Sequence, residues 1–164
     1  AQLFCYPDTV ASPKWLTPAE MKAWLGFVTS SADLLRAIEK DLEPFGLDGG
    51  DYQLLAMLSE APDHRLKMCD LASVLRLSRS GLTRRMEGVV KAKYVARVRD
   101  ETDGRAAFAL LTPKGFDLLK RVAPEHLKSV RRLMIDQLTN AEVKAIGSAF
   151  AKIGKTLRGD TEAR

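Results

Sequence analysis

The segment from residue 71 to residue 112 constrains the fold of this chain more than any other part of it. Apolar residues recur at helical spacing in its first half, which predicts two short helices joined by a tight turn. In its second half, extended stretches flank Asp103-Gly104, a dipeptide typical of a β-hairpin turn. A helical pair followed by a hairpin therefore forms the centre of the predicted structure. The two helices are expected to pack through Leu71, Ala72, Leu75, Leu77, Leu82 and Met86.

Basic side chains are concentrated on the second of these helices and on the hairpin. Residues 65–105 hold eleven lysines and arginines against five acidic residues, whereas residues 17–64 hold three against nine. A basic helix of this size fits the major groove of DNA, and an arginine at a hairpin tip fits the minor groove. The sequence therefore predicts a protein that binds double-stranded DNA. The residues expected to contact it are Ser78, Arg79, Ser80, Thr83, Arg84, Arg85, Arg97, Arg99, Asp103 and Arg105.

These side chains differ in their expected roles. Short hydroxyl groups near a helix N-terminus, such as Ser78 and Ser80, can reach phosphates. Arg105, at the predicted hairpin tip, is attracted by the negative potential of a narrow minor groove. Asp103 cannot itself favour DNA because its charge repels phosphate. It either positions Arg105 or serves the turn.

Residues before this central segment predict an arm followed by a long helix. Residues 1–16 are interrupted by prolines and lack periodicity, so they are expected to form an arm. Thr17, Pro18 and Glu20 are typical of a helix start, because threonine and glutamate can form a capping box and proline suits the first helical position. Apolar residues then recur at helical spacing, which predicts a helix within residues 17–45.

Residues 113–158 predict further helices. Proline inside a helix removes a hydrogen bond, so Pro124 is expected to kink or restart the first of them. A narrow coiled-coil-like seam follows a capping box at Thr139 and Glu142. One small winged domain would not bury this seam, so we favour a homodimer over packing within one chain. A two-fold dimer would present two helices to one duplex. The seam consists of Val143, Ile146, Phe150, Ile153 and Leu157.

The expected fold class is mainly α with a small β wing. Residues 17–164 are expected to form a single domain, with a winged helix-turn-helix part at about 50–112 and dimerisation helices at 17–45 and 113–158. The apolar runs are far too short to span a bilayer, and the chain starts without the pattern of a signal peptide. We therefore expect a cytoplasmic protein that makes no contact with a membrane.

The sequence argues against an enzyme. Its two histidines, His64 and His126, lie in unrelated segments, and no nucleophile elbow, P-loop, metal pair or Rossmann glycine pattern is present. The residues from Asp48 to Asp51 predict a turn rather than a calcium loop, because the ligand spacing and the distal glutamate are missing. We expect no metal and no cofactor.

The order of the helices and four short groups of residues carry a resemblance that covers roughly residues 17–158. The groups are Leu71-Ala72 with Leu75 and Ser78, Leu82-Thr83-Arg84, Asp103-Gly104-Arg105, and Leu111-Thr112-Pro113-Lys114-Gly115. In this order and spacing they resemble the MarR family of bacterial winged helix-turn-helix regulators. The resemblance implies a homodimer that binds an operator and usually represses. It also implies that a small anionic or phenolic compound often releases the DNA. Carried over by position, it places Ser78, Ser80, Thr83 and Arg84 on the DNA and Arg105 in the minor groove.

Two features depart from the family pattern at the end of the second helix. The family usually has a leucine-glutamate pair and then a glycine before the wing, whereas this chain has Val89-Val90 and then Lys93. A lysine in a left-handed cap costs about 1 kcal/mol relative to glycine. Gly88 lies inside the helix, at a cost of about 1 kcal/mol relative to alanine. Neither departure touches the residues expected to contact DNA.

Regulation admits more than one interpretation. Aromatic residues at helical spacing are more often plain core, which is the favoured interpretation, and Arg65 can equally belong to a solvated loop. The redox alternative uses Cys5 or Cys69, since a helix N-terminus lowers a thiol pKa. A third alternative is a winged domain used only for nonspecific DNA or protein contacts. The residues that could bind an effector are Trp24, Phe27, Val28, Met57, Arg65 and Leu66.

Overall fold

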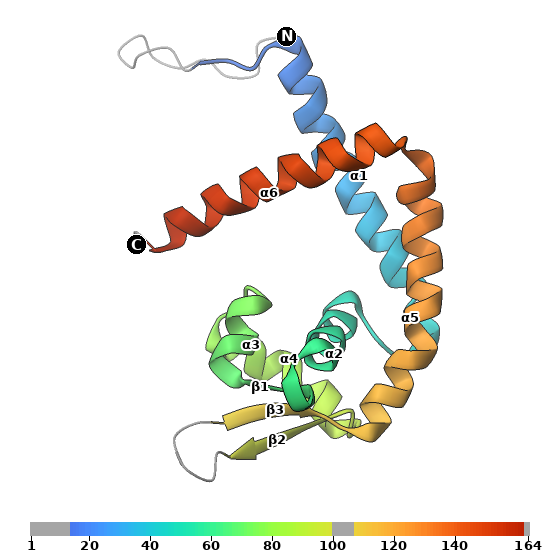
Figure 1. The fold of residues 1–164 in the computed structure, drawn as a ribbon, viewed down its shortest axis with the longest axis vertical. Coiled ribbons are helices and arrows are strands. Elements are labelled where there is room, and N and C mark those ends of the chain that lie inside the picture. The colour runs from blue at the N-terminus through green and yellow to red at the C-terminus, as the bar shows by residue number, and fades with distance from the viewer. Residues whose placement is uncertain (1–13, 100–106, 163–164) are drawn as a thin grey trace. The chain divides into compact units, whose positions relative to one another are not determined.

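The computed structural model describes residues 14–99 and 107–162, which belong to two compact units, Ala1–Asp33 and Leu34–Arg164. Helix α1 (Pro18–Lys40) begins in the first unit and ends in the second (Figure 1). Its start confirms the predicted capping box, because the Thr17 amide donates to Glu20 Oε2 at 2.7 Å and the Glu20 amide donates to Thr17 Oγ1 at 3.3 Å. These hydrogen bonds lower the pKa of Glu20. Among the described residues, no helix is long and apolar enough to cross a membrane.

The second unit is mainly helical with one small antiparallel sheet, as the sequence predicts. Its elements in chain order are η1 (Glu43–Phe45), α2 (Gly49–Glu60), η2 (Pro62–His64), β1 (Arg65–Lys67), α3 (Met68–Val74), α4 (Arg79–Lys91), β2 (Val95–Arg99), β3 (Ala107–Leu111), α5 (Pro113–Leu133), η3 (Ile135–Gln137) and α6 (Asn140–Glu162).

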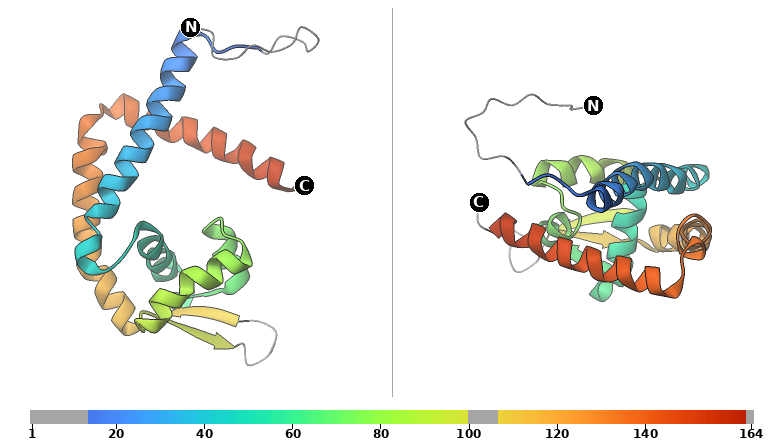
Figure 2. Two further views of the ribbon diagram at one scale, coloured as in Figure 1. Left: turned by 180° about the vertical axis from the view of Figure 1, so that it is seen from behind. Right: turned by 90° about the horizontal axis from the view of Figure 1, so that it is seen from above.

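The sheet has the order β1-β3-β2, with β3 in the centre. Strands β2 and β3 pair antiparallel from Val95 opposite Leu111 to Arg99 opposite Ala107, which confirms the predicted hairpin arms. The two arrows lie side by side in the left view of Figure 2. The predicted Asp103-Gly104 turn lies outside the described residues. Pairing of β1 with β3 joins the hairpin to the segment just before α3.

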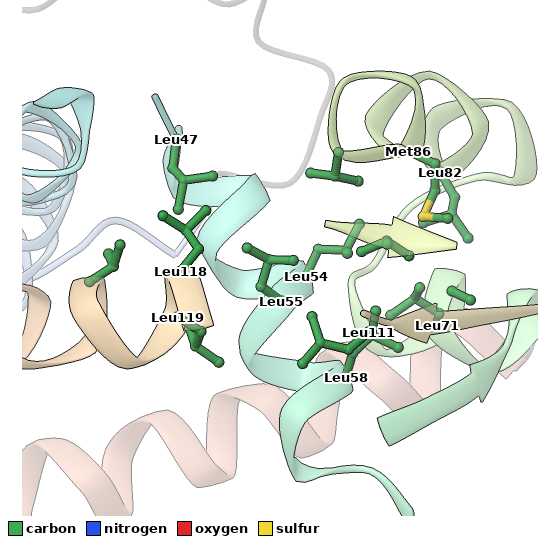
Figure 3. Packing of buried hydrophobic residues seen from close by; sticks show 14 of the residues in the cluster. Leu47, Leu54, Leu55, Leu58, Leu71, Leu82, Met86, Leu111, Leu118 and Leu119 are labelled. Carbon is green, nitrogen blue, oxygen red and sulfur yellow. The ribbon is translucent and has the colours of Figure 1, made fainter. Parts of the chain in front are cut away.

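Leucines of α2 form the middle of the core of the second unit. Leu54, Leu55 and Leu58 are fully buried, and the packed side chains of α4 and α5 surround them (Figure 3). Burial of each such side chain contributes roughly 1.5–3 kcal/mol. The predicted packing of the two central helices is confirmed: Leu71, Ala72, Leu82 and Met86 are buried, while Leu75 and Leu77 are partly buried against the core.

The end of α4 is attached to the start of α5 by the residues from Thr112 to Gly115. Thr112 Oγ1 donates a hydrogen bond to the Lys93 carbonyl at 2.8 Å and accepts one from the Gly115 amide at 3.1 Å. Lys114 Nζ donates at 2.9 Å to the carbonyl of the residue that caps α4. A Cβ atom at Gly115 would lie 2.2 Å from the Tyr94 carbonyl oxygen. This close approach therefore requires glycine.

Helix α4 ends in a left-handed residue, as the family pattern implies, but that residue is a lysine. Lys93 has φ 62°, its amide donates to Val90 O at 2.9 Å, and the Tyr94 amide donates to Val89 O at 2.9 Å. This pair of hydrogen bonds closes the helix C-terminus. The structure thus retains the helix end and accepts the backbone strain of a side chain there.

One local expectation is wrong, and another holds only in part. Helix α2 begins at Gly49, within the residues predicted to form a turn, because Asp48 Oδ1 accepts from the Asp51 amide at 2.7 Å and caps the helix. The residues predicted as a turn thus provide its cap and first turn. Of the kink or restart predicted at Pro124, the restart does not occur, because α5 continues through this residue. Pro124 and Lys120 are both exposed, so water can hydrogen-bond the carbonyl that the proline leaves without an amide donor.

Two substitutions at the end of α4 are expected to stabilise the protein. Lys93→Gly relieves the positive φ, and Gly88→Ala adds a methyl group where nothing lies within 4 Å. Each is expected to raise the free energy of unfolding by about 1 kcal/mol, measured by urea denaturation. Gly115→Ala is the opposite control, since its Cβ would collide with backbone. A lower stability for Lys93→Gly would contradict the strained cap.

Candidate nucleic-acid interface

The start of α4 is built to leave its first turn accessible. Ser78 caps the helix: its Oγ accepts from the Gly81 amide at 3.0 Å and lies 3.1 Å from Ser80 Oγ. Ser78, Arg79 and Ser80 are all exposed. The first amides of a helix have no carbonyl partner within it, and the helix dipole is positive at this end. The first turn of α4 can therefore receive a phosphate oxygen.

One face of α4 is buried and the other is exposed. Leu82, Met86 and Val89 are buried in the core, and their spacing fixes the rotation of the helix. Thr83 and Arg84 are exposed. Thr83 Oγ1 donates to the Arg79 carbonyl at 3.0 Å, which leaves its oxygen able to accept a hydrogen bond. The predicted contact residues Arg79, Ser80, Thr83 and Arg84 thus share a solvent-facing surface.

Sequence reasoning missed Glu87, which is also exposed on α4. It lies three residues after Arg84 and four after Thr83, so it belongs to the same helix surface. A carboxylate can accept a hydrogen bond from the N4 amino group of cytosine in the major groove. The helical spacing alone could have identified it, but its negative charge excluded it from a search for basic side chains.

Basic side chains from three elements meet beside α4. A cavity of about 340 Å³ is lined by Lys67 at the end of β1, Arg79 and Thr83 of α4, and Arg97 of β2. Lys67 was not among the predicted contacts, and only the basic composition of residues 65–105 hinted at it. Its position follows from the pairing of β1 with β3, which the sequence did not predict. The cavity brings three positive charges close to the exposed surface of α4.

The wing contributes two further predicted residues. Arg97 and Arg99 are exposed on β2 and lie two residues apart, so both belong to one face of the strand. Asp103 and Arg105 lie outside the described residues. Their roles in the hairpin tip and the minor groove stay predictions.

Arg85 differs from the other arginines of α4. Its Nη1 donates to both carboxylate oxygens of Asp48 and lies 3.3 Å from Asp51 Oδ1. Burial acts to raise the pKa of Asp48, but hydrogen bonds from Arg85 and from backbone amides, with the Arg85 charge, hold that pKa below its usual value. Burial and the neighbouring Asp48 charge raise the pKa of Asp51. The guanidinium is thus engaged with α2.

The predicted effector residues lie in different surroundings. In α1, Trp24, Phe27 and Val28 are 54%, 47% and 42% exposed, so they are not core residues of a single chain. The Trp24 and Phe27 ring centroids lie 6.2 Å apart. Met57 and Leu66 pack, partly buried, against the core of the second unit.

Arg65 and the cysteines complete the sequence-predicted set. The guanidinium carbon of Arg65 lies 5.2 Å from the Phe108 ring centroid, a cation–π contact on an exposed strand. Cys69 is exposed, and its Sγ donates to Asp70 Oδ1 at 3.4 Å. Cys5 lies outside the described residues.

The fold and this surface define a winged helix-turn-helix domain, with α3 and α4 as the helical pair and β2 and β3 as the wing. The sequence pattern of the MarR family matches residues 45–106. The structure is similar to AbsC, a MarR family transcriptional regulator from Streptomyces coelicolor, with 38% identity, a TM-score of 0.86 and coverage of 90% of this chain and 99% of AbsC.

A second solved structure adds DNA to the comparison. Sco3205, a MarR family transcriptional regulator from Streptomyces coelicolor in complex with DNA, is 32% identical, with a TM-score of 0.85 and coverage of 88% of this chain and 92% of Sco3205. The HTH-type transcriptional repressor YetL of Bacillus subtilis (strain 168) is 27% identical over 111 residues, or 66% of each chain. The chain belongs to the MarR family. It is a DNA-binding transcriptional regulator rather than an enzyme.

The two kinds of contact on this surface predict different mutant behaviour. Lys67→Ala is expected to weaken binding to all DNA sequences and to reduce the salt dependence by about one unit of slope, because one phosphate-proximal cation is lost. Thr83→Ala and Arg84→Ala are expected to change which bases are preferred. Random-sequence selection followed by affinity measurement at several salt concentrations distinguishes these effects. Lys128→Ala in α5 is the control for loss of a lysine elsewhere.

Equal losses on selected and random DNA for both Thr83→Ala and Arg84→Ala would remove these residues from base recognition. An unchanged salt slope for Lys67→Ala would place the basic cavity away from the phosphates.

Proposed function

We propose that the protein is a homodimeric repressor that binds a pseudo-palindromic operator and is released by a small aromatic anion. The observation that carries the DNA-binding part is the exposed face of α4, with Arg79, Ser80, Thr83 and Arg84 beside the basic cavity. In this proposal α4 occupies the major groove, and its first turn receives a phosphate. Arg97 and Arg99 contact the phosphate backbone of the DNA, and Arg105 enters the minor groove. Sco3205, which is 32% identical, has a structure in complex with DNA, and this supports DNA binding by the present chain.

The homodimer is supported by apolar side chains exposed along two long helices. Helix α1 buries no side chain, and its Leu25, Val28 and Leu35 are 52%, 42% and 66% exposed. Ile153 of the predicted seam in α6 is 51% exposed. Apolar surface of this extent on a single chain marks an association surface. A second copy of the chain would cover it and would place two α4 helices on half-sites about 10 base pairs apart.

A charge placed in the seam is expected to separate the dimer and abolish high-affinity operator binding. Ile153→Glu leaves the core of the second unit intact, so a monomer with one α4 helix remains. Sedimentation velocity and operator binding, measured on the same samples, test this. Lys152→Glu introduces a carboxylate at the exposed position next to it and serves as the control. A wild-type monomer that binds the operator fully would contradict the dimer.

Repression and release by a ligand complete the proposal. YetL, which this chain matches over 66% of the length of YetL, is a transcriptional repressor. The effector is expected to be a small aromatic anion, because the residues predicted from sequence to bind it combine aromatic Trp24 and Phe27 with the cation Arg65. An effector that favours the DNA-free state must bind that state more tightly than the DNA-bound state.

Ligand and operator are expected to weaken each other's binding by the same factor, roughly 5–150-fold. Titration of salicylate and related compounds tests this, with Trp24 fluorescence followed in a Trp15→Phe variant. A ligand that saturates the protein and leaves operator affinity unchanged is not an effector. The redox alternative replaces this one if peroxide releases the DNA and Cys69→Ser or Cys5→Ser abolishes that release.

A further inference from the structure

Arg85 joins α4 to the start of α2 across 34 to 37 residues of sequence. Its guanidinium donates hydrogen bonds to the carboxylates of Asp48 and Asp51. The Arg85 side chain is 32% exposed, and those of Asp48 and Asp51 are 45% and 21% exposed. Arg84, the preceding residue, faces solvent. Two adjacent arginines of one helix therefore have different surroundings: one is available to DNA and the other is held by acidic groups of the protein.

The first turn of α2 is shaped around this guanidinium. A Cβ atom at Gly50 would lie 2.6 Å from Arg85 Cζ and 2.7 Å from Nη2, closer than side-chain contacts allow. At Gly49, by contrast, a Cβ atom would have nothing within 4 Å. A side chain at position 50 would therefore displace the Arg85 guanidinium, whereas one at position 49 would not. The Asp48-Gly49-Gly50-Asp51 segment forms a seat for Arg85, with an acidic group at each end and a glycine under the guanidinium.

Asp48 has two roles in this seat. It caps α2 by accepting from the Asp51 amide at 2.7 Å, and it accepts from Arg85. The same carboxylate therefore sets the start of one helix and holds a side chain of another. Partly exposed ion pairs contribute little to overall stability, whereas a planar guanidinium held by carboxylates has a defined direction. This contact therefore matters more for the orientation of α4 on α2 than for the free energy of unfolding.

We propose that Arg85 is a positioning residue for DNA recognition: through Asp48, Asp51 and the space at Gly50 it fixes the placement of α4 on α2, and so directs Thr83 and Arg84 toward the bases. This inference rests on the proposed function, in which α4 contacts operator bases. It assigns to Arg85 a role different from the phosphate contact that its charge alone suggests. It also gives Asp48 and Gly50 roles in operator recognition although neither contacts DNA.

The two roles predict opposite effects on DNA affinity when the charge of Asp48 is removed. If Arg85 contacts a phosphate, its loss lowers the salt slope by about one unit, and removal of the nearby negative charge of Asp48 strengthens DNA binding. If Arg85 positions α4, loss of either partner weakens operator binding and leaves the salt slope on random DNA unchanged. Asp48→Asn is a suitable change because asparagine still caps a helix.

The sharpest test compares Gly50→Ala with Gly49→Ala in the full-length dimer. Both variants keep every charge and both place alanine in the first turn of α2, but only the change at position 50 displaces Arg85. Affinities for the selected operator and for random DNA are measured over a range of salt concentrations, with circular dichroism as a check of folding. Gly50→Ala, Asp48→Asn and Arg85→Gln are each expected to weaken operator binding about tenfold. The affinity of these three variants for random DNA is expected to be unchanged. Gly49→Ala is expected to bind the operator as tightly as the wild-type protein does.

The Asp48→Asn/Arg85→Gln double variant is expected to lose no more than either single variant, because the two residues act as one contact. Equal losses on operator and random DNA for Arg85→Gln, with stronger binding by Asp48→Asn, would overturn the positioning role and restore a phosphate contact. Gly50→Ala that behaves like Gly49→Ala would overturn it as well. A wild-type protein without any preferred sequence would instead refute the proposed function, and the positioning role with it.

Discussion

Burial of one face of α4 is the interaction on which the DNA-binding surface depends. Leu82, Met86 and Val89 pack into a core whose centre is formed by the leucines of α2. Once these three side chains are buried, the helix cannot rotate without exposing them, at a cost of several kcal/mol in total. The exposed positions of α4 are then determined. The amphipathic pattern of a short sequence thus selects the side chains that a partner can meet.

Polar contacts at the C-terminal end and near the middle of α4 refine this placement. At its C-terminus, Thr112 and Lys114 bind carbonyl groups at the helix end, and Gly115 allows α5 to approach the Tyr94 carbonyl. Closer to its middle, Arg85 is held by the start of α2. The helix is therefore fixed by apolar burial on one side and by directional contacts to α2 and α5. The bending or shifting of either neighbour would change how the exposed face meets a duplex.

Local signals in the sequence predicted most of the elements. The capping boxes at Thr17 and Thr139, the helix start at Ser78 and the left-handed end at Lys93 each depend on residues within five positions of one another. Such contacts can be inferred from spacing alone. The start of α2 was missed because a DGGD sequence favours a turn until the capping role of Asp48 is considered.

Contacts distant in sequence could not be predicted in this way. Lys67 approaches Arg97 only because β1 pairs with β3, and three residues of β1 carry no pattern that names a partner strand. Arg85 and Arg84 look alike in sequence, and only the fold separates them. A charge count assigns both to DNA, whereas the structure shows that one of them already has acidic neighbours.

Cross-linking from single positions of α4 to DNA tests the central claim most directly, namely that the exposed face of α4 meets the bases. Cysteines are placed at positions 80, 84 and 87, and at position 152 of α6 as a control, in a protein whose Cys5 and Cys69 are serines. Each is labelled with a photoactivatable group and irradiated on the selected operator. The account predicts cross-links to bases within each half-site from all three α4 positions and none from position 152. Cross-links from position 152 without any from α4 would contradict it.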